Sequence, residues 1–145
     1  PRFGVTNYFI GRVIKKEPII IYGNGEFIRD YVYIGDIIEA LLLASEDNPK
    51  VNNKVFLLGS NKKMRFIDMA REVIAAVEEI MGLKGEIEFK NFPEEHKKVD
   101  VGDSLVDYKN FNKATGWKPK LGFEEGIRRT VSFYNERYKD YLENE

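Results

Sequence analysis

The 145-residue sequence contains no cysteine and only one histidine, His96. Without cysteine there can be neither a disulfide framework nor a thiolate metal site, and a single histidine cannot form a paired-histidine zinc site. No apolar run approaches the roughly 20 residues that span a bilayer, and no signal peptide is recognisable. We therefore expect a cytoplasmic protein with no bound metal and no membrane partner.

Motifs for cofactor binding and catalysis are also missing. No strand-like run is followed by G-x-G-x-x-G or G-x-x-G-x-x-G, the turns that bind a dinucleotide pyrophosphate. No tyrosine precedes a lysine by four residues, the spacing that places the two side chains on one helical face. The chain alone is therefore predicted to bind no cofactor, to contain no catalytic residue and to be inactive.

What is present is the composition of an ordinary globular protein, with 43% hydrophobic and 32% charged residues. The formal net charge of -1 argues against a nucleic-acid partner, because such proteins concentrate positive charge on one face. The length suffices for one domain with a substantial core. The sequence begins with Pro1 and not with methionine, so we expect residues 1–145 to be a single domain cut from a longer protein.

Hydrophobic residues recur at helical spacing in five segments, with short β-branched or alternating runs between them. Strands that alternate with helices indicate an α/β fold. Three or four short strands would form a small mixed or parallel sheet with flanking helices, too small for a complete doubly wound enzyme. The predicted helices begin near Thr6, Asp36, Phe66, Asp107 and Phe123, and the predicted strands are 19–22, 27–34, 55–58 and 86–90.

Three of these segments carry more specific expectations. Asp36 and Glu39 form an acidic variant of the capping box, which predicts that Asp36 caps its helix. The apolar run in that helix predicts burial on more than one side, and the run 55–58 predicts a buried strand. Gly82 is expected to end the helix that begins at Phe66.

The most informative block is YGNGEFIRDYVYIGD, residues 22–36. It predicts a strand, a glycine turn, an extended segment that contains Arg29, and a helix. The chemistry of Arg29 allows two interpretations. The first is an ion pair with Asp30 or another acid, as is common for surface arginines. The second is a planar guanidinium that binds phosphate through two hydrogen bonds.

This block resembles a pattern of the extended short-chain dehydrogenase/reductases that act on nucleotide sugars, the NAD-dependent epimerases and dehydratases of the UDP-glucose 4-epimerase and dTDP-glucose 4,6-dehydratase type. A second block, DYKNFNKATGWKP at 107–119, and FEEGI at 123–127 resemble later segments of that family in the same order. The resemblance implies the C-terminal substrate domain of an extended Rossmann-type enzyme, without the N-terminal NAD-binding domain.

By this resemblance, Arg29 would bind the substrate diphosphate and Tyr22 would line the base pocket, with a core role as the alternative for Tyr22. The family commonly places an arginine three residues before an aspartate in the loop that precedes residue 107. Here Lys97 and Asp100 fit that spacing, and Asp103 fits the family's Gly-Asp pair. Lysine supplies the charge but not the two-pronged geometry of arginine. The alternative for this loop is a solvated run of charges.

The resemblance implies a parent enzyme, an isomerase or lyase that holds NAD and is usually a homodimer. The partners of the chain would be a nucleotide-diphosphate sugar and the missing Rossmann domain. The sequence also allows a stand-alone sugar-nucleotide-binding or interaction module without catalysis.

Overall fold

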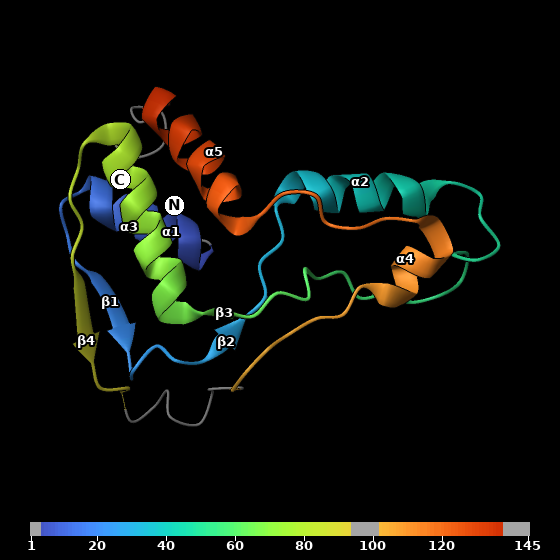
Figure 1. The fold of residues 1–145 in the computed structure, drawn as a ribbon, viewed down its shortest axis with the longest axis horizontal. Coiled ribbons are helices and arrows are strands. Elements are labelled where there is room, and N and C mark those ends of the chain that lie inside the picture. The colour runs from blue at the N-terminus through green and yellow to red at the C-terminus, as the bar shows by residue number, and fades with distance from the viewer. Residues whose placement is uncertain (1–3, 94–101, 138–145) are drawn as a thin grey trace. The chain divides into compact units, whose positions relative to one another are not determined.

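The computed structural model describes residues 4–93 and 102–137, with elements in the order α1, β1, β2, α2, β3, α3, β4, α4, α5 (Figure 1). The described residues divide into two compact units. The first unit contains the described residues of segments 1–27, 65–102 and 124–145, and the second contains 28–64 and 103–123. Helices around a short parallel sheet confirm the predicted α/β class.

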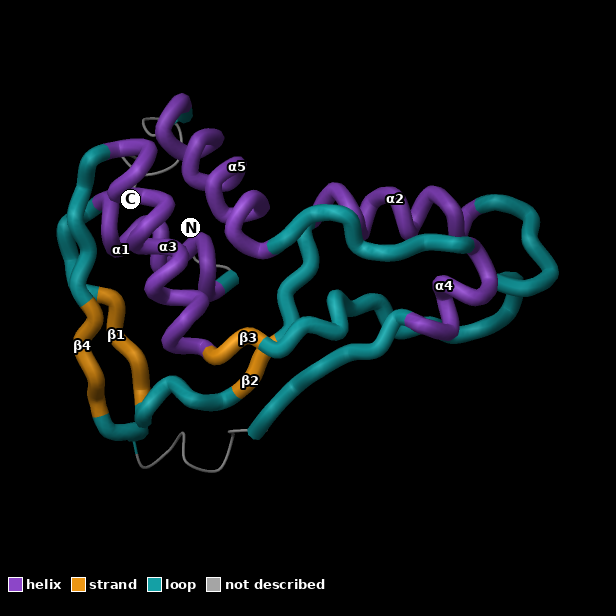
Figure 2. The backbone as a smooth tube through the Cα atoms, in the orientation of Figure 1, coloured by secondary structure: helices purple, strands orange, loops and turns teal. Residues whose placement is uncertain are grey.

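The first unit is built on two parallel strands. β1 (Ile19–Tyr22) pairs with β4 (Ile87–Lys90), so that Ile19 lies opposite Ile87 and Tyr22 opposite Lys90. Figure 2 shows the two strands side by side. Helix α1 (Val5–Ile14) packs against β1 and against α3 (Phe66–Met81), and α5 (Phe123–Glu136) contributes buried Ile127 and Val131.

Helix α3 follows the sequence pattern closely. Ile67, Ala70, Val73 and Val77 recur at helical spacing and are all buried, as an amphipathic helix requires. The helix ends at Gly82, whose φ of 67° is left-handed and whose N–H donates to the carbonyl of residue 78. Glycine adopts this conformation without the steric cost that other residues meet, so the predicted stop is confirmed.

The second unit contains α2 (Ile34–Ser45) and α4 (Lys109–Thr115). The two-residue strands β2 (Ile28–Arg29) and β3 (Met64–Arg65) pair where the chain passes between the units. The core of the second unit consists of Ala40, Val51, Phe111 and Trp117, with Leu43, Phe56, Leu58, Tyr108 and Ala114 packed around it.

Asp36 does not cap its helix, contrary to the sequence-based expectation. Helix α2 begins two residues earlier, at Ile34, and Asp36 is buried inside the first turn with 5% of its surface exposed. Its Oδ2 accepts hydrogen bonds from the backbone N–H groups of Lys120 (3.1 Å) and Leu121 (3.0 Å). The carboxylate therefore joins the start of α2 to the chain after Trp117.

The predicted burial of α2 and of segment 55–58 is wrong for the described residues. Among the residues of α2, the buried ones are Asp36 and Ala40, while four large apolar side chains are exposed. Segment 55–58 is not assigned as a strand, and Val55 and Leu57 are 94% and 68% exposed. Each segment packs some of its side chains against the core, but its exposed apolar side chains have no covering neighbour within residues 4–93 and 102–137.

Other boundaries shift by smaller amounts. Only residues 28 and 29 of the extended stretch predicted over 27–34 form a strand, β2, because its pairing partner β3 is also two residues long. Helix α4 begins at Lys109, two residues after Asp107, and its N-cap residue Tyr108 makes no side-chain capping hydrogen bond. Asp107 lies just before the cap, and its Oδ1 accepts a hydrogen bond from the Lys109 N–H at 2.7 Å.

Candidate functional site

Arg29 lies on β2 next to an anchored residue, Ile28. The Ile28 N–H donates to Asp103 Oδ1 at 2.8 Å, and the Ser104 N–H donates to the Ile28 carbonyl at 2.9 Å. The half-buried Arg29 side chain turns back, and its Nη1 donates to the same carbonyl at 2.9 Å. The predicted residues Arg29 and Asp103 are thus brought to adjoining segments of the second unit.

Asp30 anchors the other side of Arg29. Its Oδ1 accepts hydrogen bonds from the Ser60 N–H (2.8 Å) and hydroxyl (2.5 Å), and its Oδ2 accepts from the N–H groups of Asn61 (3.1 Å) and Val106 (3.0 Å). One carboxylate therefore joins three segments of the second unit. Sequence reasoning considered Asp30 only as an ion-pair partner of Arg29.

Gly59 permits this convergence. A Cβ atom at Gly59 would overlap Val106 and would lie 2.8 Å from Asp30 Oδ2. A side chain at position 59 is therefore incompatible with the hydrogen bonds that hold residue 30. Ser60 and Asn61, which directly follow Gly59, supply three of the four hydrogen bonds that the Asp30 carboxylate accepts.

Tyr31 follows Asp30 and contacts Phe123, with ring centroids 5.0 Å apart. Its hydroxyl is buried and has no hydrogen-bond partner among the described residues. Burial raises the pKa of Tyr31 to about 12, and the positive charge of Arg29 opposes this rise. The phenol therefore stays protonated near neutral pH and is unsuited to act as a base there.

Tyr22 belongs to the first unit, at the end of β1. Its ring is 39% exposed and lies 5.9 Å from the ring of Phe92. The turn after it is the predicted glycine turn, with φ of 74° at Gly23, where a Cβ would come within 2.6 Å of the Phe92 ring. The predicted site residues Lys97 and Asp100 lie outside the described residues.

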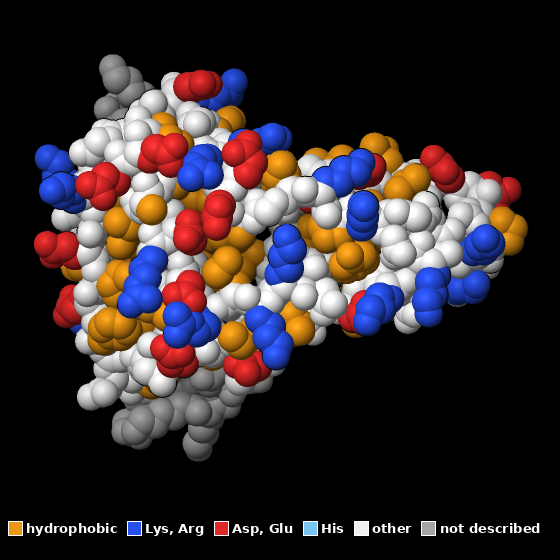
Figure 3. Space-filling view, in the orientation of Figure 1, with side chains coloured by type: hydrophobic (Ala, Val, Ile, Leu, Met, Phe, Trp, Pro, Cys, Tyr) orange, Lys and Arg blue, Asp and Glu red, His pale blue; other side chains and the backbone are white. Residues whose placement is uncertain are grey.

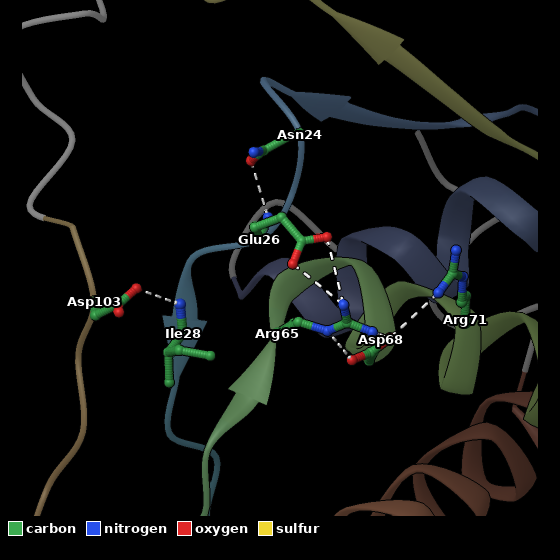
Figure 4. Close-up of polar contacts among 7 residues, drawn as sticks. All are labelled: Asn24, Glu26, Ile28, Arg65, Asp68, Arg71 and Asp103. Atoms are coloured by element: carbon green, nitrogen blue, oxygen red, sulfur yellow. Dashed lines mark hydrogen bonds and ion pairs between the residues drawn. The ribbon is translucent and has the colours of Figure 1, made fainter.

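Beyond this turn, a charged network connects Glu26 to the start of α3 (Figure 4). Arg65 contacts Asp68 through Nε (2.6 Å) and Nη2 (2.9 Å) and Glu26 through Nη1 (3.2 Å), while Arg71 contacts Asp68 at 3.3 Å. The hydrogen bond from Arg65 lowers the pKa of the Asp68 carboxyl. These side chains are solvated, so the network adds little stability and mainly orients the 23–26 turn.

Over residues 4–93 and 102–137, no three acidic or histidine side chains gather into a group that could hold a metal ion. In the same residues, none of the helices has the length and apolar character needed to cross a membrane.

Comparisons with known proteins agree on one family. A family model described as GDP-mannose 4,6 dehydratase matches residues 5–130. A UDP-glucuronate 4-epimerase from Thermodesulfobacterium geofontis is 30% identical over 128 residues, which are 88% of this chain and 36% of that protein. A putative UDP-glucose 4-epimerase from Methanocaldococcus jannaschii is 30% identical over 132 residues, 90% of this chain and 38% of that protein.

A solved structure with the same fold is the UDP-glucose 4-epimerase of Thermotoga maritima with UDP-glucose. The TM-score is 0.79 at 30% identity, over 95% of this chain and 41% of that one. The chain thus spans little more than a third of the length of the relatives in sequence. Because the family model covers most of its length, the chain belongs to the GDP-mannose 4,6 dehydratase family, and its relatives include enzymes named as nucleotide-sugar epimerases and dehydratases.

Proposed function

We propose that this chain is the nucleotide-sugar-binding portion of an NAD-dependent epimerase or dehydratase, and that Arg29 binds the diphosphate of the substrate. The relatives named for UDP sugars make a UDP sugar the first candidate. In this proposal residues 1–145 act as one binding domain. The chain would supply binding and orientation, while catalysis would take place only together with the rest of the protein.

The observation that supports this proposal is the anchoring of Arg29 on both sides. Ile28, the residue before Arg29, forms hydrogen bonds with Asp103 and Ser104. Asp30, the residue after Arg29, is fixed by the four hydrogen bonds that its carboxylate accepts. A guanidinium on a fixed backbone loses little freedom on binding and can present parallel N–H donors to phosphate oxygens. A merely solvent-exposed arginine would need no such framework.

The chain does not fit NAD. Its sequence has neither the glycine-rich turn that receives a dinucleotide pyrophosphate nor a Tyr-x-x-x-Lys pair for proton transfer. In the parent enzyme, NAD would supply hydride transfer at the sugar. The contribution of this chain is positioning: a clamped diphosphate fixes the sugar, and such orientation can lower a reaction barrier substantially.

Further contacts are proposed from the resemblance alone. Tyr22 would lie against the base, and Lys97 and Asp100 would contact phosphate and ribose. Asp103 accepts a hydrogen bond from Ile28 with Oδ1, which makes it first of all a support of β2. A homodimeric parent and a cytoplasmic location also remain predictions.

Calorimetric titration with UDP, dTDP, CDP and GDP sugars tests the role of Arg29. We expect saturable binding of one nucleotide class. Arg29→Ala should weaken that binding by about 1.5–3 kcal/mol, the value of a hydrogen bond to a charged group. This loss corresponds to a rise in Kd of about 10- to 150-fold. The Kd of Arg29→Lys should lie between those of the unaltered chain and Arg29→Ala, because lysine keeps the positive charge but cannot donate two parallel hydrogen bonds.

Arg71→Ala is the matched control, because Arg71 is a well-exposed arginine of the first unit that forms an ion pair with Asp68. It should leave the Kd unchanged. Equal Kd values for Arg29→Ala and the unaltered chain would refute the assignment of Arg29. A folded chain that binds none of the four nucleotide classes, even when joined to the rest of its protein, would favour the interaction module without a ligand.

A further inference from the structure

Helix α3 begins without a side-chain cap, and a remote turn supplies acceptors in its place. The N-cap residue of the helix makes no side-chain capping hydrogen bond. The Phe66 N–H donates to the carbonyl of Phe27 at 3.0 Å, and the Ile67 N–H donates to the carbonyl of Gly25 at 2.9 Å. The first N–H groups of an α-helix have no partner within the helix, so these acceptors stabilise its start. We call residues 23–27 the capping turn.

The capping turn is held in place on both sides of its second residue. The Gly23 N–H donates to the Lys90 carbonyl at 2.8 Å, directly after the pairing of β1 with β4. At Gly25, a Cβ atom would lie 3.1 Å from Ile67 and 3.2 Å from Ile21, so the backbone there is closely packed. The turn therefore has little room for a longer main chain.

Asn24 lies between these two glycines with its side chain exposed, and it is the only asparagine in the sequence that a glycine follows. Its Oδ1 accepts the Glu26 N–H at 3.1 Å, which folds the side-chain amide back over the next peptide group (Figure 4). This donor would stabilise negative charge that develops on Oδ1. Gly25 is buried, yet its N–H has no acceptor among the residues that the structure describes, which is rare for a buried backbone group.

We propose that Asn24 is a site of spontaneous deamidation, in which the backbone nitrogen of Gly25 attacks the side-chain Cγ of Asn24. The nitrogen loses its proton to solvent and bonds to Cγ, the bond from Cγ to Nδ2 breaks, and ammonia leaves. Water then opens the cyclic succinimide at one of its two carbonyls, which gives aspartate or isoaspartate. Glycine favours the attack because no side chain hinders its nitrogen. The proposal goes beyond sugar-nucleotide binding and involves neither Arg29 nor a ligand.

Aspartate at position 24 changes the charge but not the length of the main chain. It adds a carboxylate near Glu26, which accepts a hydrogen bond from Arg65 at 3.2 Å. Acidic and basic side chains are intermixed over the face of the first unit in the space-filling view, so the new carboxylate joins a mixed surface (Figure 3). The aspartate form should therefore keep the hydrogen bonds of the capping turn.

Isoaspartate changes the main chain itself. It places the Cβ atom of residue 24 in the backbone and lengthens the path between Gly23 and Gly25, whose hydrogen bonds hold both ends. The Gly25 carbonyl must then move away from the Ile67 N–H, because the close packing leaves no room for the extra atom. The first turn of α3 thereby loses an acceptor.

Ageing of the purified chain at neutral pH, followed by peptide mass spectrometry, tests the site. We expect Asn24 to convert at least about tenfold faster than Asn53 and Asn61, exposed asparagines that lysine follows, because an oriented and unhindered nucleophile lies beside Asn24. Isoaspartate should appear together with aspartate, and Asn24→Gln should stay unconverted. Conversion no faster than at Asn53 would overturn the proposal, as would aspartate alone, the product of direct hydrolysis.

Unfolding separates the effect of the structure from that of the sequence. In guanidinium chloride the hydrogen bond to Oδ1 is lost, so Asn24 should convert no faster than in the folded chain. Slower conversion in the folded chain would show that the anchored turn blocks the attack, and would overturn the proposal.

Hydrogen exchange measures the effect on α3. In the isolated isoaspartate form, the Ile67 amide should exchange about tenfold faster than in the unmodified chain, as expected when one backbone hydrogen bond is lost. Asn24→Asp, which adds the charge alone, should leave that amide unchanged, and the Val73 amide within α3 is the internal reference. Equal exchange of Ile67 in the isoaspartate and unmodified forms would overturn the connection to the helix start. None of these readouts involves nucleotide binding, so failure here leaves the assignment of Arg29 to its own titration.

Discussion

Replacing Asp30 by alanine should destabilise the second unit by about 3–4 kcal/mol, since hydrogen bonds to a charged group contribute about 1.5–3 kcal/mol each and several are lost together. The donors are the backbone N–H groups of Ser60, Asn61 and Val106 and the Ser60 hydroxyl. Water can replace part of the loss at the exposed Asn61, which keeps the total below the sum of four bonds. Asp30→Ala should also release the backbone on one side of Arg29.

Urea unfolding followed by the fluorescence of Trp117 measures this effect directly, because Trp117 is the only tryptophan and lies in the core of the same unit. Asp103→Ala is the graded control. It removes a single exposed hydrogen bond, from the Ile28 N–H, and should cost about 1 kcal/mol. If Asp30→Ala and Asp103→Ala lower the free energy of unfolding by the same amount, the four hydrogen bonds to Asp30 do not stabilise the second unit more than the single bond to Asp103.

Trp117→Ala should cost about 3–5 kcal/mol, the usual range for removing a buried tryptophan side chain. Trp117 is 3% exposed, its ring meets Tyr108 and Phe111 edge-on at 5.7 and 5.8 Å, and its Nε1 donates to the Asp36 carbonyl at 2.9 Å. The substitution therefore leaves both a cavity and an unpaired buried acceptor. The second unit has a small core, so the loss of its largest member should unfold it near physiological temperature.

Circular dichroism and amide exchange must replace fluorescence for this variant. Trp117→Phe keeps much of the ring volume but not the Nε1 donor, and should lose roughly half as much stability as Trp117→Ala. Phe133→Ala, on the exposed side of α5, should lose less than about 1 kcal/mol, as expected for a surface position. If Trp117→Ala is as stable as Phe133→Ala, Trp117 does not stabilise the core of the second unit as proposed.

The elements that sequence reasoning predicted well are those set by local chemistry. The stripe of α3 and the left-handed stop at Gly82 depend on neighbours within one or two turns, and so does the glycine turn after β1. Phe66–Met81 and Ile19–Tyr22 therefore match their predicted bounds. Only the resemblance to a family suggested that Arg29 and Asp103 lie near one another, because no local pattern connects Asp103 to its hydrogen-bond partner Ile28, 75 residues earlier.

What sequence reasoning missed depends on distant partners. The donors to Asp30 include Ser60 and Val106, which lie 30 and 76 residues after it in the sequence. The donors to Asp36 are Lys120 and Leu121, which lie 84 and 85 residues after Asp36. Short polar side chains look alike in sequence whether they cap a helix or join remote segments. Val55 is a second case. Its apolar side chain predicted burial, but the sequence does not indicate which segment would cover it, and it is exposed in the structure.

The interleaving of the two units affects the order in which the protein can fold during synthesis. The chain passes between the units at 27/28, 64/65, 102/103 and 123/124. Asp30 leaves the ribosome 76 residues before Val106, a delay of about 4–15 s at about 5–20 residues per second. Throughout that interval α2 and segment 55–58 have neither Trp117 nor Phe111 to pack against. The apolar side chains of both segments therefore stay uncovered during that interval, and the second unit completes its core only after Phe111 and Trp117 have been synthesised.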